Sequence, residues 1–144
     1  MRTIRCDARV PDVVRELATR EAPRECCGLL VGTAAAITGA VPIANIAQEI
    51  GRFELDPAAH IKMRREAREC GLEVVGVFHS HVATPAVPSR RDLAEAAYPE
   101  YLCGIVSLQN GRTDFRLFEL RGDSFDEVEM AIDRSRSSPA APSQ

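Results

Sequence analysis

Residues Val74–Asp92, VVGVFHSHVATPAVPSRRD, carry an apolar run that ends in a set of potential metal ligands. The run is rich in β-branched residues, so a buried strand is predicted over 73–79. His79 and His81 follow at its end, and side chains two residues apart in a strand lie on one face. Asp92 comes eleven residues after His81. Two imidazoles and a carboxylate are a plausible set for a tetrahedral Zn²⁺ with an open fourth position.

Each of these residues also has a structural interpretation. Taken alone, the histidine pair fits one hydrogen-bonded core residue and one loop residue. Ser89 and Asp92 form Ser-x-x-Asp, close to the capping box that begins a helix. Metal binding requires instead that the loop 82–88, which holds two prolines, folds back and presents Asp92 to the histidines. The two roles compete for the Asp92 carboxylate, whereas the Ser89 hydroxyl can accept from a backbone N–H and still donate to an oxyanion.

The composition is that of an ordinary globular protein. The chain has 144 residues, 45% of them hydrophobic and 27% charged, which fits one domain with a substantial core. The net charge of −3 argues against nucleic acid as a partner. No apolar run approaches a membrane span, and no apolar signal core follows the N-terminus, so we expect a cytoplasmic protein without membrane contact. The five cysteines are an odd number without a C-x-x-C pair, which favours buried, reduced thiols.

The remaining patterns predict one α/β domain over residues 1–132, a mixed β-sheet flanked by helices. Residues 133–144 are predicted to form a disordered tail. Asn110-Gly111 predicts a tight hairpin turn. Helices are predicted at 10–21, 56–70 and 89–97, and strands at 2–6 (as a sheet edge), 25–32, 35–41, 53–55, 73–79, 101–108 and 112–120, with 122–130 either a strand or irregular.

The helix at 56–70 has clear boundary signals. Asp56 is a good N-cap, Pro57 suits the first helical position, and Gly71 ends the pattern. His60 lies in its middle and is interpreted as a surface or structural residue. The face predicted to pack inward consists of Ile61, Met63, Ala67 and Cys70.

Glu25 is unexpected because it is a carboxylate at the start of the apolar run ECCGLLVG, residues 25–32. Its common interpretation is a solvent-exposed strand end. Its functional interpretation is a general base beside the open position of the metal, which would take a proton from the attacking water and pass it to the leaving amine. Cys26 and Cys27 are more readily explained by burial than by ligation. Ser80 points away from the histidines by alternation and lacks a base of its own.

Together these residues resemble the JAMM metalloprotease family. The resemblance rests on Glu25 in PRECCGLLVG and on H-S-H-x7-S-x2-D, which places His79, His81, Ser89 and Asp92. It spans about residues 10–120, and all five positions of the motif are present. One departure is Val82, where many members have proline.

The resemblance implies a zinc peptidase. It implies Zn²⁺ held by His79, His81 and Asp92, with Glu25 as general acid and base and Ser89 as the donor that stabilises the oxyanion. The implied JAB/MPN fold is similar to that of cytidine deaminases, whose own C-x-x-C ligand pair is missing here.

The length and wording of the motif resemble the short bacterial members of the family. Those enzymes hydrolyse the amide bond after the C-terminal Gly-Gly of a ubiquitin-like sulfur-carrier protein, for example releasing cysteine from a carrier–cysteine adduct. Two alternatives stay open: a non-catalytic module that binds a ubiquitin-like protein and keeps a structural metal, and an amidase for small peptides. The sequence also leaves a homodimer open.

Overall fold

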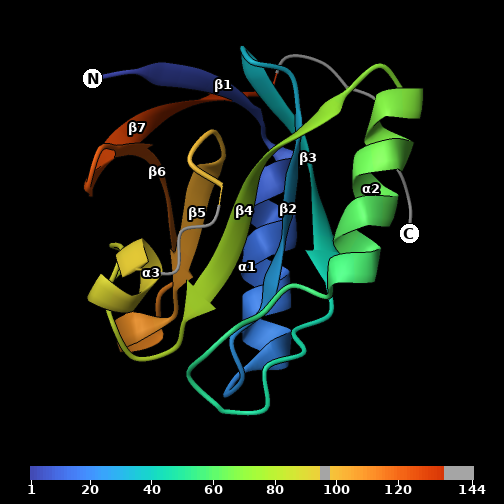
Figure 1. The fold of residues 1–144 in the computed structure, drawn as a ribbon. Helices are drawn as coiled ribbons and strands as arrows, with labels where there is room; N and C mark the ends of the chain where they lie inside the picture. Colours follow the sequence, from blue (N-terminus) through green and yellow to red (C-terminus); the bar gives the residue numbers. More distant parts are fainter. Residues whose placement is uncertain (95–97, 135–144) are drawn as a thin grey trace.

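A computed structural model describes residues 1–94 and 98–134 and contains one mixed sheet with helices on both faces (Figure 1). The sheet closes on itself in the strand order β1-β3-β2-β4-β5-β6-β7. This confirms the predicted α/β class. The strands are β1 (Thr3–Asp7), β2 (Cys27–Gly32), β3 (Ala36–Ile43), β4 (Glu73–His81), β5 (Leu102–Ser107), β6 (Asp114–Arg121) and β7 (Ser124–Asp133).

The first strand differs from its prediction as a sheet edge. β1 pairs in parallel with β3 on one side and with β7 on the other, so both of its backbone edges are used. The segment 122–130, left between strand and irregular, forms the long strand β7. Together β1 and β7 close the sheet, a long-range pairing that no local pattern in the sequence reveals.

The helix α1 (Arg9–Glu21) packs against one face of the sheet, behind it in Figure 1. Its apolar side chains, among them Val14 and Leu17, join the largest core cluster of the protein, to which Phe78 and Leu117 also belong. Pro11 lies in the first turn of this helix, where a missing N–H costs nothing.

The helix α2 (Pro57–Glu69) covers the opposite face (Figure 1), and its boundaries follow the predicted signals. The side chain of Asp56 accepts a hydrogen bond from the Ala58 N–H. Gly71 follows the helix with a φ of +75°, a conformation that glycine adopts without strain. The predicted inward face is partly wrong. Met63 and Ala67 are buried, but Ile61 and Cys70 are exposed, and His60 takes the inward position because buried residues follow the spacing 60, 63, 67.

Three further predictions differ in detail. The segment 53–55 makes only an isolated bridge between Asn45 and Leu55. The β5–β6 hairpin is longer than a two-residue turn: it contains a short 3-10 helix, η1 (Gln109–Gly111), with Asn110 in the left-handed region. The predicted helix at 89–97 is present as α3 (Arg90–Ala94), and its last three residues lie outside the described chain.

The tail was predicted over 133–144, but its first residue, Asp133, is the last residue of strand β7. Residues 135–144 of the predicted tail lie outside the described residues. Four of the five cysteines are buried free thiols, as predicted, whereas Cys70 is a free thiol that is exposed. None of the described helices is long and apolar enough to cross a lipid bilayer.

Candidate metal centre

The predicted ligands converge at the carboxyl end of β4. His79 and His81 project from the same face of the strand, and their Nε2 atoms lie 3.2 Å apart. The Asp92 carboxylate reaches both, with Oδ1 at 3.1 Å from His79 Nε2 and Oδ2 at 3.2 Å from His81 Nε2. The two imidazoles are buried and Asp92 is mostly so. The structure therefore brings together the three residues that the sequence singled out.

The helix cap and the ligand role of Asp92 do not compete. The Ser89 N–H donates to Asp92 Oδ2 (2.8 Å) and the Asp92 N–H donates to Ser89 Oγ (3.0 Å), a reciprocal capping box at the start of α3. Each carboxylate oxygen has two lone pairs, so Oδ2 accepts from Ser89 while it also faces His81. The cap thus fixes the carboxylate in the orientation that points it at the imidazoles.

The loop between β4 and α3 folds back onto the sheet, as metal binding requires. The carbonyl of Thr84 accepts a hydrogen bond from the Ser107 hydroxyl. Ala86 is buried against Cys103 and Ile105 on the outer face of β5. These contacts hold the loop down, so that α3 begins beside the end of β4.

Different contacts orient the two imidazoles. His81 Nδ1 lies 2.9 Å from the carbonyl oxygen of Pro85, to which it donates, so its Nε2 is left with a free lone pair. The ring of His79 stacks on Phe53 with 4.3 Å between ring centroids and 14° between ring planes. His79 Nδ1 has no hydrogen-bond partner among the described residues. His79 is therefore held by aromatic stacking, whereas His81 is held by a hydrogen bond.

The donor set fits a small cation. Zn²⁺ bonds of about 2.0–2.1 Å place tetrahedral nitrogen and oxygen ligands about 3.3 Å apart, close to the separations of 3.1–3.2 Å here. These three residues are the ones in the described chain whose donor atoms converge in this way. Zinc is one ion that two imidazoles and a carboxylate suit, and the geometry alone does not single it out.

The charges at this centre support one another. Burial raises the pKa of the Asp92 carboxyl, but hydrogen bonds from His79, His81 and the Ser89 N–H outweigh it and hold that pKa far below its ordinary value. Burial lowers the pKa of His81, but the Asp92 carboxylate and the Pro85 carbonyl raise it by more, so the net shift is upward. Asp92 is therefore ionised, as a ligand must be.

Glu25 lies on the same face of the sheet as the histidines. β2 runs antiparallel to β4 with Cys27 opposite His79, and the Ser80 N–H donates to the Cys26 carbonyl, so the pairing continues past the end of β2. Glu25, two residues before Cys27, shares its face with Cys27 and hence with His79. Burial raises the pKa of Glu25, and the imidazoles of His79 and His81 lower it by less. A raised carboxyl pKa suits a group that must both take and give a proton.

The other candidate residues have structural partners. Ser80 points away from the imidazoles, and its Oγ accepts a hydrogen bond from the Cys26 N–H at 2.8 Å. The Cys27 thiol donates to the Ile43 carbonyl. Burial raises the pKa of the Cys26 thiol to about 11 and of the Cys27 thiol to about 12, which keeps both protonated. His60 is buried and lies 3.1 Å from the Tyr101 hydroxyl, a structural role.

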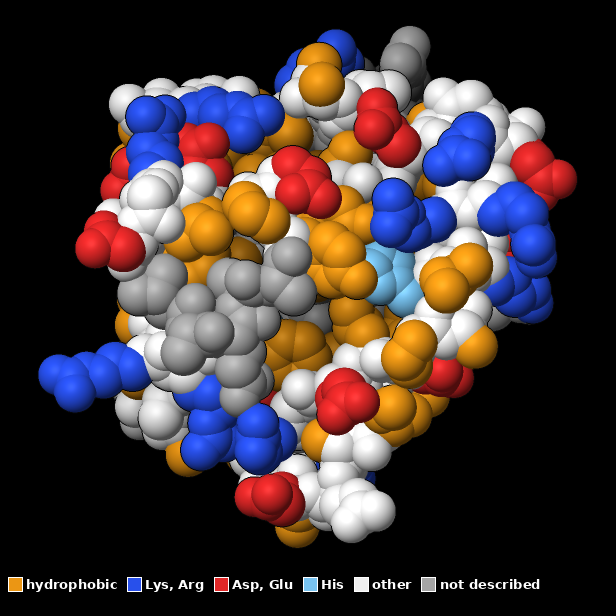
Figure 2. Space-filling model, viewed as in Figure 1, with side chains coloured by type: hydrophobic (Ala, Val, Ile, Leu, Met, Phe, Trp, Pro, Cys, Tyr) orange, Lys and Arg blue, Asp and Glu red, His pale blue; other side chains and the backbone are white. Residues whose placement is uncertain are grey.

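A cavity of about 310 Å³ opens beside the metal centre, with His79 and Asp92 in its wall. Figure 2, viewed as Figure 1, shows apolar side chains gathered at the centre of the face that is turned toward the viewer. We call this cavity the apolar groove. Its other walls come from the segment 53–57, from α2 and from the strands β4, β5, β6 and β7, with aromatic contributions from Phe53, Tyr98, Tyr101 and Phe125.

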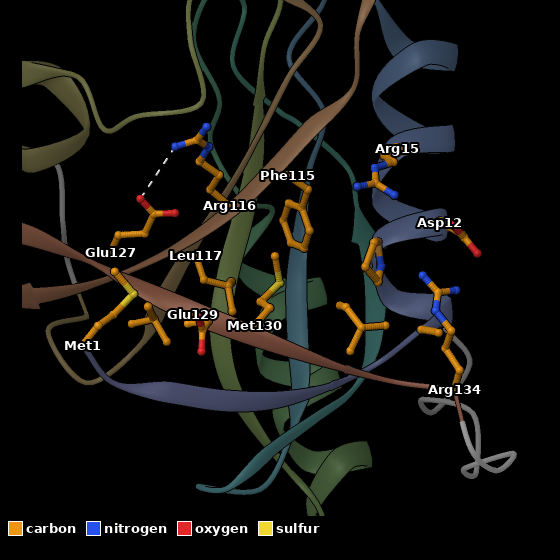
Figure 3. Close-up of a pocket in the computed structure, with 14 residues that line it drawn as sticks. Met1, Asp12, Arg15, Phe115, Arg116, Leu117, Glu127, Glu129, Met130 and Arg134 are labelled. Atoms are coloured by element: carbon orange, nitrogen blue, oxygen red, sulfur yellow. Dashed lines mark ion pairs between the residues drawn. The ribbon is translucent and has the colours of Figure 1, made fainter.

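A larger cavity of about 400 Å³ lies between α1 and the strands β6 and β7 (Figure 3). It contains none of the predicted site residues. Arg116 in its wall pairs with Glu127 at 3.7 Å, and Arg15 donates to the Thr113 carbonyl. The candidate site is therefore assigned to the apolar groove, whose wall contains His79 and Asp92.

The sequence analysis missed two contributors to the site. Phe53 was assigned only to a short strand, yet its ring is the wall on which His79 rests. The Pro85 carbonyl was assigned only to a loop, yet it orients His81. No pattern in the sequence predicts either contact, because each one forms only when an irregular segment folds against the histidines.

Comparison with known proteins shows the family. A family model described as prokaryotic homologues of the JAB domain matches residues 7–120. A desampylase from Haloferax volcanii is 34% identical over 122 residues, covering 83% of this chain and 86% of the relative. A CysO-cysteine peptidase from Mycobacterium tuberculosis is 30% identical over 95 residues, or 65% of each chain. A probable TtuB-protein conjugate cleaving protease from Thermus thermophilus is 34% identical over 80 residues, covering 55% and 53%.

Solved structures agree. A protein from Desulfitobacterium hafniense superimposes with a TM-score of 0.81 at 29% identity, covering 90% of this chain and 92% of the other. A JAB1/MPN domain protein from Archaeoglobus fulgidus has a TM-score of 0.58 at 18% identity, covering 88% and 98%, and shows the shared fold. The chain belongs to the family of prokaryotic homologues of the JAB domain. The predicted JAB/MPN fold and the predicted class of enzyme, a JAMM-type peptidase, are confirmed.

Replacing Asp92 with Asn tests its role as a ligand. The amide oxygen can still accept from the Ser89 N–H, so α3 keeps its cap while the site loses its anionic donor. Loss of a partner that only supports a ligand costs about 10- to 100-fold in metal affinity. We expect Asp92→Asn to lose more zinc affinity than this, as measured by competition with a chromophoric chelator. Asp56→Asn, the same change at the cap of α2, should bind zinc normally. Equal affinity in Asp92→Asn and the wild type would exclude Asp92 as a ligand.

Metal binding should weaken in mild acid. The pKa of His81 is raised above its ordinary 6.5, so this imidazole takes up a proton at a higher pH than a free histidine and then cannot bind a metal. The apparent zinc affinity should therefore fall progressively as the pH is lowered from 8 to 5. Chelator competition across this range measures it. An affinity that does not change with pH across this range would contradict imidazole ligation.

Proposed function

We propose that this chain is a zinc-dependent peptidase that hydrolyses the amide bond after the C-terminal Gly-Gly of a ubiquitin-like protein, in a conjugate or an amino-acid adduct. The observation that carries the proposal is the convergence of His79, His81 and Asp92 within 3.2 Å, on the face that Glu25 shares. The names of the relatives, which describe cleavage of protein conjugates and of a carrier–cysteine adduct, support the same substrate class.

His79, His81 and Asp92 would hold the ion. When bound, Zn²⁺ supplies a Lewis acid that polarises a carbonyl and brings the pKa of a water to about 7. The buried imidazoles and the capped carboxylate keep these donors in place, so binding requires little reorganisation of the protein.

Glu25 would move the proton. Its half-buried carboxyl, whose pKa lies above the ordinary value, takes a proton from the attacking water and then delivers it to the nitrogen of the leaving amine. Without that delivery the amine would leave as an unstable anion, so the second transfer matters as much as the first.

Ser89 would stabilise the oxyanion. Its Oγ already accepts from the Asp92 N–H, so the hydroxyl proton is free to point at the carbonyl oxygen as negative charge develops there. Its exposed position at the start of α3 leaves the hydroxyl accessible to a substrate.

The lining of the apolar groove also supports this substrate class. A Gly-Gly segment has no side chains, so its backbone can approach the metal centre closely. The aromatic rings farther along the groove would then receive an apolar side chain that precedes the two glycines. The tail of a ubiquitin-like protein presents these features in an extended chain that can reach a narrow site.

Removing the base should abolish cleavage without removing the metal. Glu25→Gln keeps the size of the side chain but cannot take a proton, so the rate should fall by about 10²- to 10⁴-fold, while zinc content stays near one ion per chain. Glu69→Gln, the same change at an exposed glutamate in α2, is the control and should be fully active. Normal cleavage by Glu25→Gln would refute the assignment of the base.

A substrate panel distinguishes the proposal from its alternatives. The protein is incubated with a folded ubiquitin-like carrier bearing an amino acid on its C-terminal Gly-Gly, and separately with short peptides ending in the same sequence. We expect cleavage of the carrier adduct, loss of activity with a chelator and recovery on adding zinc. Binding without cleavage would indicate the non-catalytic module, and equal rates on peptide and carrier would indicate the small-peptide amidase.

A further inference from the structure

Asn45 links the candidate base to the wall of the apolar groove. It lies just after β3, and its side-chain amide uses its full hydrogen-bonding capacity. Nδ2 donates to the Glu25 carbonyl at 2.8 Å and to the Arg52 carbonyl at 3.0 Å. Oδ1 accepts from the N–H groups of Ala47 and Glu54, each at 3.0 Å. One side chain therefore ties the peptide after Glu25, twenty residues away in sequence, to the stretch 52–54 that precedes α2.

The first of these parts is the peptide that follows Glu25. Its carbonyl accepts from Asn45, and its N–H, which belongs to Cys26, donates to Ser80 Oγ at 2.8 Å. Because a peptide group is planar, partners at both ends fix its rotation. The fixed plane includes the Cα atom of Glu25, so these two hydrogen bonds set the point from which the Glu25 side chain extends.

The second part is the stretch that carries Phe53. Asn45 holds the Arg52 carbonyl and the Glu54 N–H, the groups on either side of this residue. The ring of Phe53 in turn stacks on His79. The segment 44–56 has one isolated bridge, with backbone hydrogen bonds from Ile46 to Glu54 and from Asp56 to Ala44, and the side-chain hydrogen bonds of Asn45 add to this limited backbone pairing.

We propose that Asn45 is a positioning residue for the peptidase reaction, which sets the Glu25 carboxylate and the Phe53 wall relative to the metal ligands. It does not touch substrate or metal. Its donor half holds the carbonyls of Glu25 and Arg52, and its acceptor half holds the N–H groups of Ala47 and Glu54, so the two halves can be tested separately. The inference rests on the proposed function, because it assumes that Glu25 transfers the proton.

Two substitutions separate the halves. Asn45→Asp has the same shape and can still accept from Ala47 and Glu54, but it has no proton to donate and turns an oxygen toward the carbonyls of Glu25 and Arg52. We expect its kcat to fall about 10- to 100-fold, the loss that small displacements of a catalytic group cause, with KM within about threefold and zinc content unchanged. Asn45→Ala loses all four bonds, so kcat should fall and KM should rise.

Amide hydrogen exchange gives a readout that is independent of activity. In Asn45→Asp the N–H groups of Ala47 and Glu54 keep their acceptor and should exchange at rates close to wild type. In Asn45→Ala both should exchange at least tenfold faster. Asn110→Asp, the same chemical change in the β5–β6 connection at a position that tolerates a left-handed backbone, should alter neither exchange at these amides nor catalysis.

Several outcomes would overturn the positioning role. One is a kcat within twofold of wild type in folded, zinc-loaded Asn45→Asp. Another is loss of zinc in that variant, or exchange at Ala47 and Glu54 as fast as in Asn45→Ala, since the defect would then be general unfolding of the segment. If wild type cleaves the carrier adduct and Glu25→Gln does not, these results count against Asn45 alone. A wild-type protein without peptidase activity would overturn the proposed function and this role with it.

Discussion

The register between β2 and β4 is the constraint on which the whole site depends. It places Cys27 opposite His79, and so brings Glu25 to the imidazole face across more than fifty residues of sequence. A slip of one residue would turn His79 and His81 toward α1 and leave Phe78 in their place. Gly28 helps to forbid that slip. A Cβ at this position would lie 2.4 Å from the Phe78 ring and from the Val41 carbonyl, so the ring can cross β2 only where glycine stands.

Given that register, the chemistry of the centre follows from the burial of its charged and titratable groups. Two buried imidazole nitrogens face each other at 3.2 Å, and both face one ionised carboxylate. Such a cluster needs positive charge, which either a proton or a cation can provide. The capping box fixes Asp92 from the backbone of its own helix, so the carboxylate does not have to give up hydrogen bonds in order to bind a metal. The short helix α3 is sufficient to orient Asp92, because only its first turn takes part in the capping box.

The features that the sequence predicted were those with local signals. The helix after Asp56, the strand before His79 and the cap at Ser89 each depend on neighbouring residues, and each is present. The closure of the sheet by β1 and β7 depends on partners more than 120 residues apart and was not predicted. The inward face of α2 was misjudged because Ile61 is more apolar than His60, yet His60 finds a buried partner in Tyr101. A prediction from hydrophobicity alone therefore placed Ile61 on the inward face of α2 instead of the adjacent His60.

The site also divides into a rigid part and an adaptable part. The histidines stand on β4, which has a hydrogen-bonded strand on each side, and a strand in that position cannot shift without disturbing the whole sheet. The groove wall at 53–55 stands on an irregular segment held by one isolated bridge and by the side-chain hydrogen bonds of Asn45. Changes in that segment can alter which tail fits while the ligand geometry stays the same. The exception is the contact of Phe53 with His79, through which the shape of the groove and the metal centre are coupled. A substitution of Phe53 would therefore change the groove wall and the support of His79 together.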